Sequence, residues 1–406
     1  MRLGILSSHP IQYQAPWFRG LAKEVELEVF FAHQPDAAQQ GEGFGKCFSW
    51  DVDLLSGYEH HFLKNISPQP SPGRFFGCDT PEISGKIFAG KFDAFIVCGW
   101  HLKSYWQAIR ACRRAEIPVL VRGDSQLMTP RSRLKTWIKE LGYRLMLRQF
   151  DGFLVVGQRN REYLAHYGVP PGKMFFAPHF VDNEWFAARA AAVRSQKSEV
   201  RKKWKIAEDA FCVLFCGKFI AKKRPMDLVA AARLLLIQNV SPKKLHLLFV
   251  GSGELDAELR RNCHVIFDAD SSNSQPSTVN QQLPAASFAG FLNQSELPAA
   301  YVAADVLVLP SDGGETWGLV VNEAMACGLP AIVSDAVGCA PDLIEEGKTG
   351  FIFPVGNAAA LAERLERLKE MRRLDFDFPT ALSQKLAHYS VKAAVEGTLQ
   401  TVKIHE

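Results

Sequence analysis

The sequence lacks the features that define several protein classes. No apolar run approaches the ~18 residues that a helix needs to cross a bilayer. The apolar stretch after Met1 is too short for a signal peptide and suits a first strand. The nine cysteines are an odd, scattered set without a C-x-x-C pair, which argues against a disulfide framework or a zinc site. These absences predict a cytoplasmic protein with reduced thiols.

Charge is also sparse. The formal net charge is only +4, with +6 carried by residues 1–180 and −2 by the remainder. This excess is far below the dense basic stripe that nucleic-acid binding requires, so we expect no nucleic-acid partner. A mildly basic first half suits an anionic acceptor or membrane surface.

The length of 406 residues fits two domains of about 200 residues each. Short β-branched and aromatic runs alternate with helical stretches, which predicts βαβ units and parallel sheets. These runs cover residues 3–7, 27–32, 94–98, 119–122, 152–156, 174–178, 212–217, 245–251, 287–290, 306–310, 331–334 and 350–353. We therefore expect an α/β protein with two Rossmann-like, doubly wound domains, 1–180 and 181–382. A helix within 383–406 is expected to pack back on the first domain.

The strongest motif lies in residues 310–330, where a strand, a glycine-rich turn and a helix follow one another. Thr316 is predicted to cap a helix that stops at Gly328. Glu315 and Glu323 are then expected to face one side, with the helix N-terminus between them as a diphosphate site. The alternative is an amphipathic helix with two exposed glutamates.

A second motif lies in residues 214–225. A strand ends at Gly217, and Lys218 and Lys223 follow before a helix opens. Cations at the carboxyl end of a parallel strand lie where α/β domains bind ligands, and they suit a departing nucleotide diphosphate. The alternative is a solvated basic loop. Glycines after the next strand, Gly251 and Gly253, are weak evidence when taken alone.

Together these stretches resemble the retaining glycosyltransferase family 4 of the GT-B fold, in which two domains face a central cleft. The resemblance is specific over residues 213–355, including the two glutamates, and looser over residues 1–180. It implies a nucleotide diphosphate sugar, UDP- or GDP-linked, as co-substrate, with no metal and no cofactor. The implied donor-binding residues are Gly217, Lys218, Lys223, Gly251, Phe291, Leu297, Gly314, Glu315, Thr316, Trp317, Gly318, Leu319 and Glu323.

The resemblance also divides the roles. Lys218 and Lys223 would hold the diphosphate, and the backbone around Gly251, Phe291 and Leu297 would flank the base. Glu315, which we also count as catalytic, and the amides from Thr316 to Leu319 would hold sugar and phosphate. Glu323 would bind the ribose.

The first domain departs further from the family pattern. Many members open with a Gly-Gly loop that contacts the donor phosphate. This chain has instead a stretch containing His9 and Gln12, which is a candidate for contact with the donor or acceptor. Asp124 stands where many members place a histidine near the reacting carbon, and a carboxylate there is able to accept the acceptor's proton. His101, which follows another strand, is a second catalytic candidate. For each, the alternative is a structural polar group in a loop.

Three Asp-x-Asp triplets suggest a metal site, namely Asp51/Asp53, Asp268/Asp270 and Asp375/Asp377. The first is isolated, the second begins a polar insert, and the third lies late in the chain. We therefore predict that no metal is bound.

Residues 131–150 form a predicted helix whose stripe of Leu134, Ile138, Leu141 and Leu145 is bordered by basic residues, with Trp137 nearby. This pattern suits a helix lying in an anionic membrane surface and would favour a lipid-linked acceptor. A core-facing helix whose lysines and arginines reach water is the alternative.

The sequence thus predicts a retaining hexosyltransferase that acts on an unidentified hydroxyl acceptor, in the cytoplasm or on the inner face of the membrane. The alternatives are a phosphorylase or epimerase of the same fold, or a non-catalytic nucleotide-sugar-binding protein.

Overall fold

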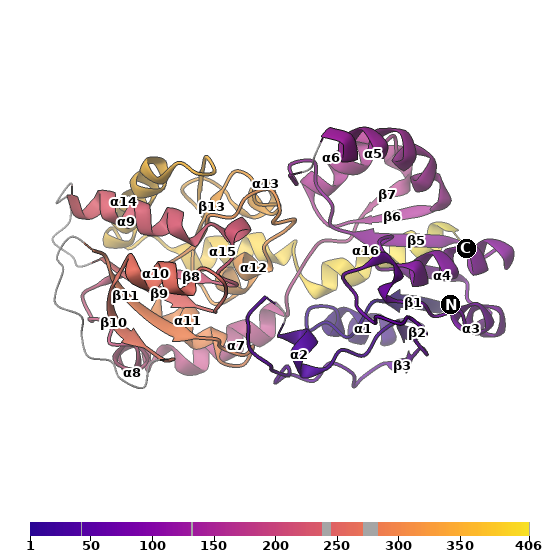
Figure 1. Cartoon of the computed structure of the whole chain (residues 1–406), viewed down its shortest axis with the longest axis horizontal. Helices are drawn as coiled ribbons and strands as arrows, with labels where there is room; N and C mark the ends of the chain where they lie inside the picture. Colours follow the sequence, from indigo (N-terminus) through magenta and orange to yellow (C-terminus); the bar gives the residue numbers. More distant parts are fainter. Residues whose placement is uncertain (42, 131–132, 238–244, 271–282, 406) are drawn as a thin grey trace. The chain divides into compact units, whose positions relative to one another are not determined.

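The computed structural model describes residues 1–41, 43–130, 133–237, 245–270 and 283–405, and within these ranges the side chains of 133–138 and 141 are not described. The backbone divides into two compact units. Unit 1 comprises Met1–Gln40, Val52–Asp182 and Tyr389–Glu406, and unit 2 comprises Gly41–Asp51 and Asn183–His388. Each unit contains one seven-stranded, wholly parallel sheet with helices on both faces (Figure 1), which confirms the predicted fold class.

The sheet of unit 1 has the order β3-β2-β1-β4-β5-β6-β7. Its strands are β1 (Arg2–Ser7), β2 (Glu26–Phe31), β3 (Glu59–Phe62), β4 (Ala94–Val97), β5 (Val119–Gly123), β6 (Gly152–Val155) and β7 (Met174–Phe176). Six of these match predicted runs. The sequence missed the edge strand β3, because Glu-His-His-Phe offers one strongly apolar residue and its pairing comes from β2.

Helices cover both faces of this sheet, and each face has its own core. On one face, α1 (Ala15–Ala22) packs against the last helix, α16 (Val391–His405), and buried Trp17 donates a hydrogen bond to Thr398 at 3.2 Å. On the other, α3 (Ile83–Gly90) packs on α4 (Lys103–Arg114). The unit also contains α2 (Ala37–Gln40), α5 (Arg133–Met146), α6 (Gln158–His166), and the 3-10 turns η1 (Phe75–Gly77), η2 (Leu147–Gln149) and η3 (Pro171–Lys173).

The sheet of unit 2 has the order β10-β11-β9-β8-β12-β13-β14. Its strands are β8 (Phe211–Cys216), β9 (Leu245–Val250), β10 (His264–Asp268), β11 (Ala285–Gly290), β12 (Val306–Leu309), β13 (Ala331–Ser334) and β14 (Gly350–Phe353). Chain order reverses around β8, between β9 and β12, and ligands of open α/β sheets bind outside the strand ends at such a reversal.

The helices of unit 2 connect these strands. They are α7 (Asn183–Arg194), α8 (Lys197–Lys203), α9 (Pro225–Ile237), α10 (Asp256–Arg261), α11 (Leu297–Ala303), α12 (Leu319–Ala326), α13 (Ala340–Leu343), α14 (Ala358–Arg373) and α15 (Phe378–Ala387), with the 3-10 turn η4 (Ala221–Lys223). The helical stretch predicted near residues 383–405 is two helices, because α15 ends at Ala387 and α16 begins at Val391.

The polar insert begins at Asp268, the last residue of β10, and residues 271–282 of it lie outside the described part of the chain. All nine cysteines are described, and each is a free thiol. No helix in the described ranges is long and apolar enough to span a bilayer.

Candidate active site

Two glycine turns meet at the carboxyl ends of β8 and β9. Gly217 follows β8 with a φ of 143° and donates its amide to Val250 O at 2.9 Å. Gly251 follows β9 with a φ of 131°, and a Cβ there would lie 2.0 Å from Gly217 O. Only glycine fits where the two backbones come this close. Neither glycine therefore places a side chain over the carboxyl ends of these strands, where parallel sheets bind ligands.

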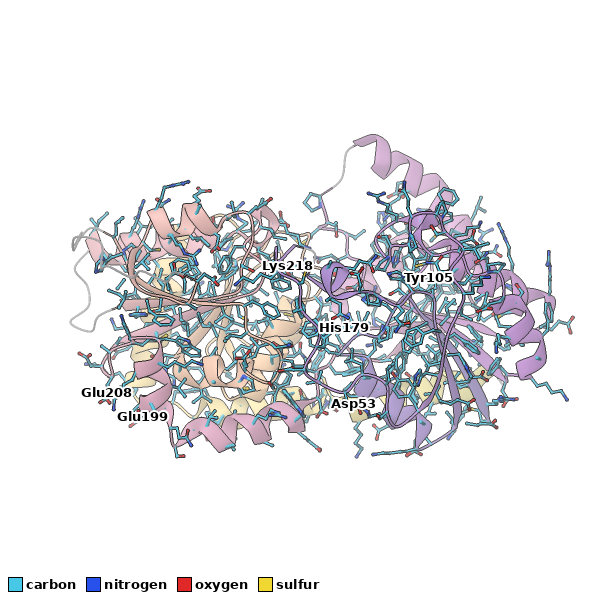
Figure 2. All side chains as sticks on the ribbon, turned by 60° about the horizontal axis from the view of Figure 1, so that its bottom comes forward. Asp53, Tyr105, His179, Glu199, Glu208 and Lys218 are labelled. Atoms are coloured by element: carbon cyan, nitrogen blue, oxygen red, sulfur yellow. The ribbon has the colours of Figure 1, made fainter. Side chains whose placement is uncertain are left out.

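Both predicted cations follow the first of these turns. Lys218, labelled in Figure 2, is half-buried and its ammonium lies 5.0 Å from the centre of the Phe44 ring. Lys223 ends η4, and its ammonium forms an ion pair with the carboxylate of Glu315. The side chains of that pair are 15% and 14% exposed, so the charges lie in a partly desolvated site at the edge of the sheet.

The helix after β12 begins later than predicted. Thr316 is not its cap, because Gly318 occupies the N-cap position with a φ of 98° and the first helical residue is Leu319. Glu315 therefore lies three residues before the N-cap instead of one, so the helical geometry assumed over all eight residues from Glu315 to Glu323 does not apply. A Cβ at Gly318 would lie 2.7 Å from the Leu309 side chain, so the strand and the helix start are in close contact.

The start of α12 lies beside Glu315 and has the polarity that an anion site requires. In the first turn of α12 the Val321 amide donates to Gly318 O at 2.9 Å, and the helix dipole places positive partial charge at this helix start. In the same turn Gly314 donates its amide to Asp312 Oδ1 at 2.7 Å, which fixes the backbone just before Glu315. Residues 314–318 thus belong to the loop between β12 and α12, and Leu319 begins the helix.

Glu323 is buried rather than exposed, with 2% of its surface accessible. It lies in the middle of α12 and accepts a hydrogen bond from the hydroxyl of Tyr301 in α11. The sequence missed Tyr301, because an aromatic residue in a short apolar helix is indistinguishable from a core residue. The alternative of two exposed glutamates is excluded, since Glu315 is also mostly covered.

Trp317, Phe291 and Leu297 differ in burial and in their place in unit 2. The Trp317 indole is 4% exposed and donates to Asn322 Oδ1 at 2.8 Å, so its side chain fastens the turn to α12. Phe291 follows β11 and is half-buried, and Leu297 is the first residue of α11, also half-buried. Gly251, Phe291 and Leu297 all lie in unit 2.

In unit 1, Asp124 lies directly after β5 and pairs with a histidine that the sequence did not single out. His179 Nε2 is 3.9 Å from Asp124 Oδ2. Burial lowers the pKa of His179, and its interaction with the accepting carboxylate of Asp124 opposes that effect. Arg122 fixes the backbone before His179 by donating to Ala177 O at 2.6 Å and Pro178 O at 2.8 Å. The chain therefore holds a carboxylate and an imidazole together at this strand end.

His101 belongs to the same group. Desolvation lowers its pKa, while the hydrogen bond that the ring donates to the Pro72 carbonyl and the charge of Asp124 raise it. Because the charge of Asp124 affects the pKa of His101, the two predicted catalytic candidates interact electrostatically. His101 is exposed, and its ring contacts Tyr105 at 5.6 Å between centroids.

The opening loop of unit 1 holds the remaining candidates. Burial lowers the pKa of His9 to about 4, with His33 adding to the effect, so His9 is neutral near pH 7. Its Nδ1 lies 3.0 Å from the hydroxyl of Ser8. Gln12 is half-buried in the turn before α1.

Five aspartates of the Asp-x-Asp triplets have partners within the protein. Asp268 pairs with Arg260 and Asp270 with Lys46, while Asp377 caps α15. Asp51 accepts from the Ser295 amide at 3.2 Å, and Asp53 accepts from two backbone amides at 3.1 Å.

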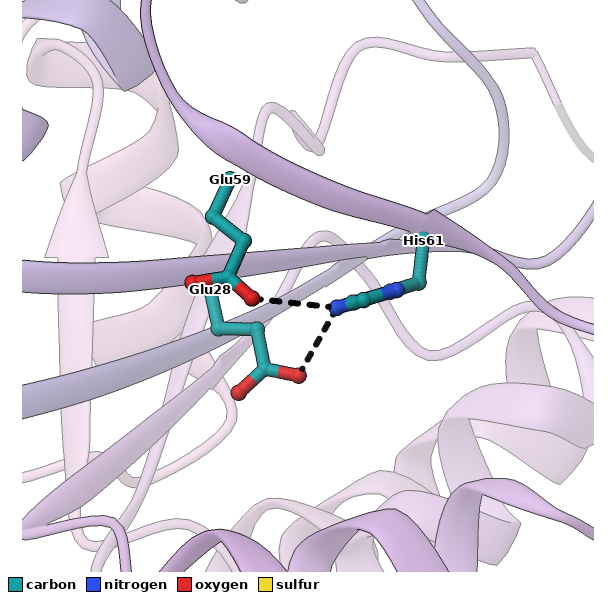
Figure 3. A group of neighbouring side chains, drawn as sticks. All are labelled: Glu28, Glu59 and His61. Carbon is teal, nitrogen blue, oxygen red and sulfur yellow. Dashed lines mark ion pairs between the residues drawn. The ribbon is translucent and has the colours of Figure 1, made fainter.

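Within the described residues, one group has three possible metal ligands close together. Glu28, Glu59 and His61 lie on the neighbouring strands β2 and β3 (Figure 3). His61 Nε2 is 3.2 Å from Glu28 and 3.4 Å from Glu59. Arg2 lies 3.1 Å from the other Glu28 oxygen, so this group forms an ion-pair cluster across β1, β2 and β3.

Comparisons with known proteins identify both halves of the chain. The family model described as "Glycosyltransferase Family 4" matches residues 18–185, and "Glycosyl transferases group 1" matches residues 210–370. A D-inositol 3-phosphate glycosyltransferase of Pseudarthrobacter chlorophenolicus is 31% identical over 238 residues, which cover 58% of this chain and 51% of the relative. The sulfoquinovosyl transferase of Arabidopsis thaliana is 40% identical over 110 residues, covering 26% of this chain and 21% of that protein. The chain thus spans about half the length of the first relative and less of the second.

Solved structures share the fold over the whole chain. The Anabaena protein HepE, crystallised with UDP and glucose, has a TM-score of 0.66 at 16% identity, with both chains covered completely. A sucrose-phosphate synthase from Thermosynechococcus elongatus has a TM-score of 0.63 at 17% identity, covering 100% of this chain and 98% of that one. These likenesses show that the chain has the GT-B fold. The two family models, which together match residues 18–185 and 210–370, show that it belongs to glycosyltransferase family 4.

Proposed function

We propose that this protein transfers a hexose, with retention of configuration, from a nucleotide diphosphate sugar to a hydroxyl acceptor. The observation that supports this most directly is the ion pair of Lys223 with Glu315 at the start of α12. It places a cation, a carboxylate and helix amides at neighbouring ends of β8 and β12, a set that suits a diphosphate and its sugar.

The reaction breaks the bond from the anomeric carbon to the donor phosphate and forms one to the acceptor oxygen on the same face. Negative charge builds on the departing diphosphate, and Lys218, Lys223 and the α12 amides stabilise it without a metal. The acceptor loses a proton, for which Asp124 is the proposed base. Glu315 holds the sugar hydroxyls, Glu323 acts at the ribose end, and no cofactor takes part.

The donor is proposed to carry UDP or GDP, and the UDP bound by HepE supports the first of these. A thermal-shift screen of UDP-, GDP- and ADP-sugars tests this, because a ligand that binds only the native state raises the melting temperature. We expect one nucleotide class to raise it, and glycosyl transfer from that donor to persist in EDTA. A shift with none of these donors would refute the proposed function, and activity restored only by manganese would refute the metal-free mechanism.

The acceptor is proposed to be presented at an anionic membrane surface on the cytoplasmic side. Helix α5 contains the predicted stripe, of which Leu134, Ile138 and Leu141 have side chains outside the described set. Leu145, the described member, is 63% exposed. Beside it, α4 and α5 enclose a groove of about 650 Å³, lined by Trp106, Ile109, Arg110, Arg113, Arg114, Gly142, Leu145, Met146 and Gln149.

A groove lined by apolar side chains and three arginines suits the acyl chains of a lipid and its anionic headgroup. Sedimentation with liposomes tests this directly. We expect the protein to pellet with anionic liposomes at low salt and to remain in the supernatant with neutral ones. Protein that stays in solution with both would make a soluble acceptor the better proposal.

A further inference from the structure

A short segment of the first half of the sequence belongs structurally to unit 2. We call residues 43–51 the strap. They follow β2 in the chain, yet they contact the loops after β8, β9 and β11. No motif marks this segment, so only the tertiary structure reveals where it lies.

The strap is anchored to unit 2 at four places along its length. Ser252, which follows β9, donates its hydroxyl to Phe44 O at 2.6 Å. Lys46 forms a 2.6 Å ion pair with Asp270. Near the other end, Asn293 donates to Ser49 O at 2.8 Å, and the Ser295 amide donates to Asp51 at 3.2 Å. Contacts from the first to the last part of the segment make the strap a fixed component of this unit.

The strap is shaped around Lys218. Gly43 has a φ of 82°, and a Cβ there would lie 2.9 Å from Lys218 Nζ and 3.0 Å from its Cδ. The neighbouring ring of Phe44 lies 5.0 Å from the same ammonium, a favourable cation–π distance. The missing side chain of Gly43 therefore leaves the space that the Lys218 side chain fills, and Phe44 holds the lysine in that position.

The strap also builds an aromatic wall against Phe291. The ring of Phe48 lies 4.3 Å from that of Phe291 with an interplanar angle of 36°, and Phe44 meets Phe291 edge-on at 5.0 Å. Trp50 adds an edge contact to Phe48 at 4.9 Å. Phe44, Phe48, Trp50 and Phe291 are all only half-buried, so the cluster keeps apolar ring surface accessible. Planar bases stack well on such surface.

We propose that the strap is part of the nucleotide site: Gly43 and Phe44 position Lys218 for the diphosphate, and Phe48 with Phe291 forms a stacking surface for the nucleobase. This rests on the proposed function, because it assigns Lys218 and Phe291 to the donor. Gly43 and Phe44 are positioning residues, and Phe48 is a binding residue. They deepen the donor site by adding a wall that the family motifs in residues 213–355 do not contain.

Calorimetric titration of the full chain with UDP, GDP, uridine and guanosine separates the two roles. Gly43→Ala should weaken binding of the preferred diphosphate about tenfold and leave its nucleoside unchanged, because the added methyl group displaces Lys218. Gly45→Ala is the matched control: Gly45 has a φ of 69°, but a Cβ there would meet nothing within 4 Å. It carries similar backbone strain without the contact with Lys218, so its affinities should stay near wild type.

Phe48→Ala should weaken nucleoside and diphosphate about equally, by roughly tenfold. Phe88→Ala, which removes a 52% exposed ring from α3 in unit 1, controls for loss of surface aromatics and should change neither affinity. Far-ultraviolet circular dichroism confirms that each variant is folded, and Phe48→Leu keeps the volume if Phe48→Ala does not fold.

Two results overturn the inference alone. If the wild type binds a diphosphate and both Gly43→Ala and the Phe48 variants bind it equally well, the strap has no role. If they bind it more tightly, the strap competes with the donor instead of completing its site. Failure of the wild type to bind either nucleotide refutes the proposed function itself, and this inference with it.

Discussion

Replacing Lys223 with alanine tests the centre of the proposed donor site. The Lys223 ammonium pairs with Glu315, and the two side chains are only 15% and 14% exposed. The substitution removes one charged partner from the diphosphate and leaves the Glu315 carboxylate without this cation. A hydrogen bond to a charged group contributes about 1.5–3 kcal/mol. Since ~1.36 kcal/mol corresponds to a factor of ten, the dissociation constant for the nucleotide should rise roughly 10- to 150-fold.

The Lys223→Ala substitution should lower kcat by a larger factor than it weakens binding of the nucleotide. The diphosphate gains charge as its bond to the sugar breaks, so a cation beside it acts most strongly in the transition state. Losing one such preorganised group typically lowers kcat by about 10²–10³. Calorimetry with UDP and GDP measures the first effect, and initial rates of donor cleavage measure the second.

The neighbouring Lys222→Ala is the matched control, because Lys222 lies in the same 3-10 turn and is exposed. It removes the same charge from the same loop and should change nucleotide affinity less than threefold. A double-mutant cycle with Glu315→Ala measures the coupling between the two residues, since the free-energy effects of substitutions at residues in contact are not additive. The double variant should lose less than the sum of the two single losses.

Two outcomes would refute this reasoning. If Lys223→Ala binds and turns over like wild type while Lys222→Ala does not, the functional cation is Lys222. If the losses of Lys223→Ala and Glu315→Ala simply add, the ion pair does not act as a unit in the site.

Three further predictions concern other parts of the molecule. Asp124→Asn should lower turnover more than His101→Ala with donor affinity kept in both, since Asp124 is the proposed base; full activity in steady-state assays of Asp124→Asn would make that residue structural. Tyr301→Phe removes a donor from buried Glu323, so the melting temperature should drop by the equivalent of about 1–3 kcal/mol; an unchanged melting temperature contradicts the importance of this bond. Burial, aided by the charge of Arg201, lowers the pKa of His246 to about 4, so the unfolded chain binds the proton first. Stability should therefore fall as the pH drops from about 6.5 through 4, by up to ~3 kcal/mol from this residue. Urea unfolding at pH 7.5, 5.5 and 4.5 measures it, and His246→Gln should show a shallower dependence; equal slopes would exclude His246 as a source.

The sequence by itself determined the parts of this protein that depend on local pattern. Twelve of the fourteen described strands follow from apolar runs of strand length, because a parallel sheet covered on both faces needs continuous apolar residues. Gly217, Gly251 and Gly318 stand where φ is positive or the backbones touch, so residue type alone marks these turns. The order of the motifs around Lys218 and Glu315 was likewise readable from the sequence, and with it the family.

The remaining features required tertiary structure, because residues distant in the sequence decide them. The edge strands β3 and β10 receive their pairing from β2 and β11 rather than from their own composition. The start of α12 at Leu319 depends on the contact of Gly318 with Leu309 and on the burial of Trp317. Local propensity contains none of these contacts, so it placed the cap two residues early.

Functional side chains were hidden for the same reason. Tyr301 and Glu323 look unrelated in sequence, and their hydrogen bond exists only because α11 and α12 pack together. His179 stands 55 positions after Asp124, and the ends of β5 and β7 bring them to 3.9 Å. The strap is the largest such case: nine ordinary loop residues join unit 2 because Lys218, Ser252 and Phe291 supply the partners that fix their position.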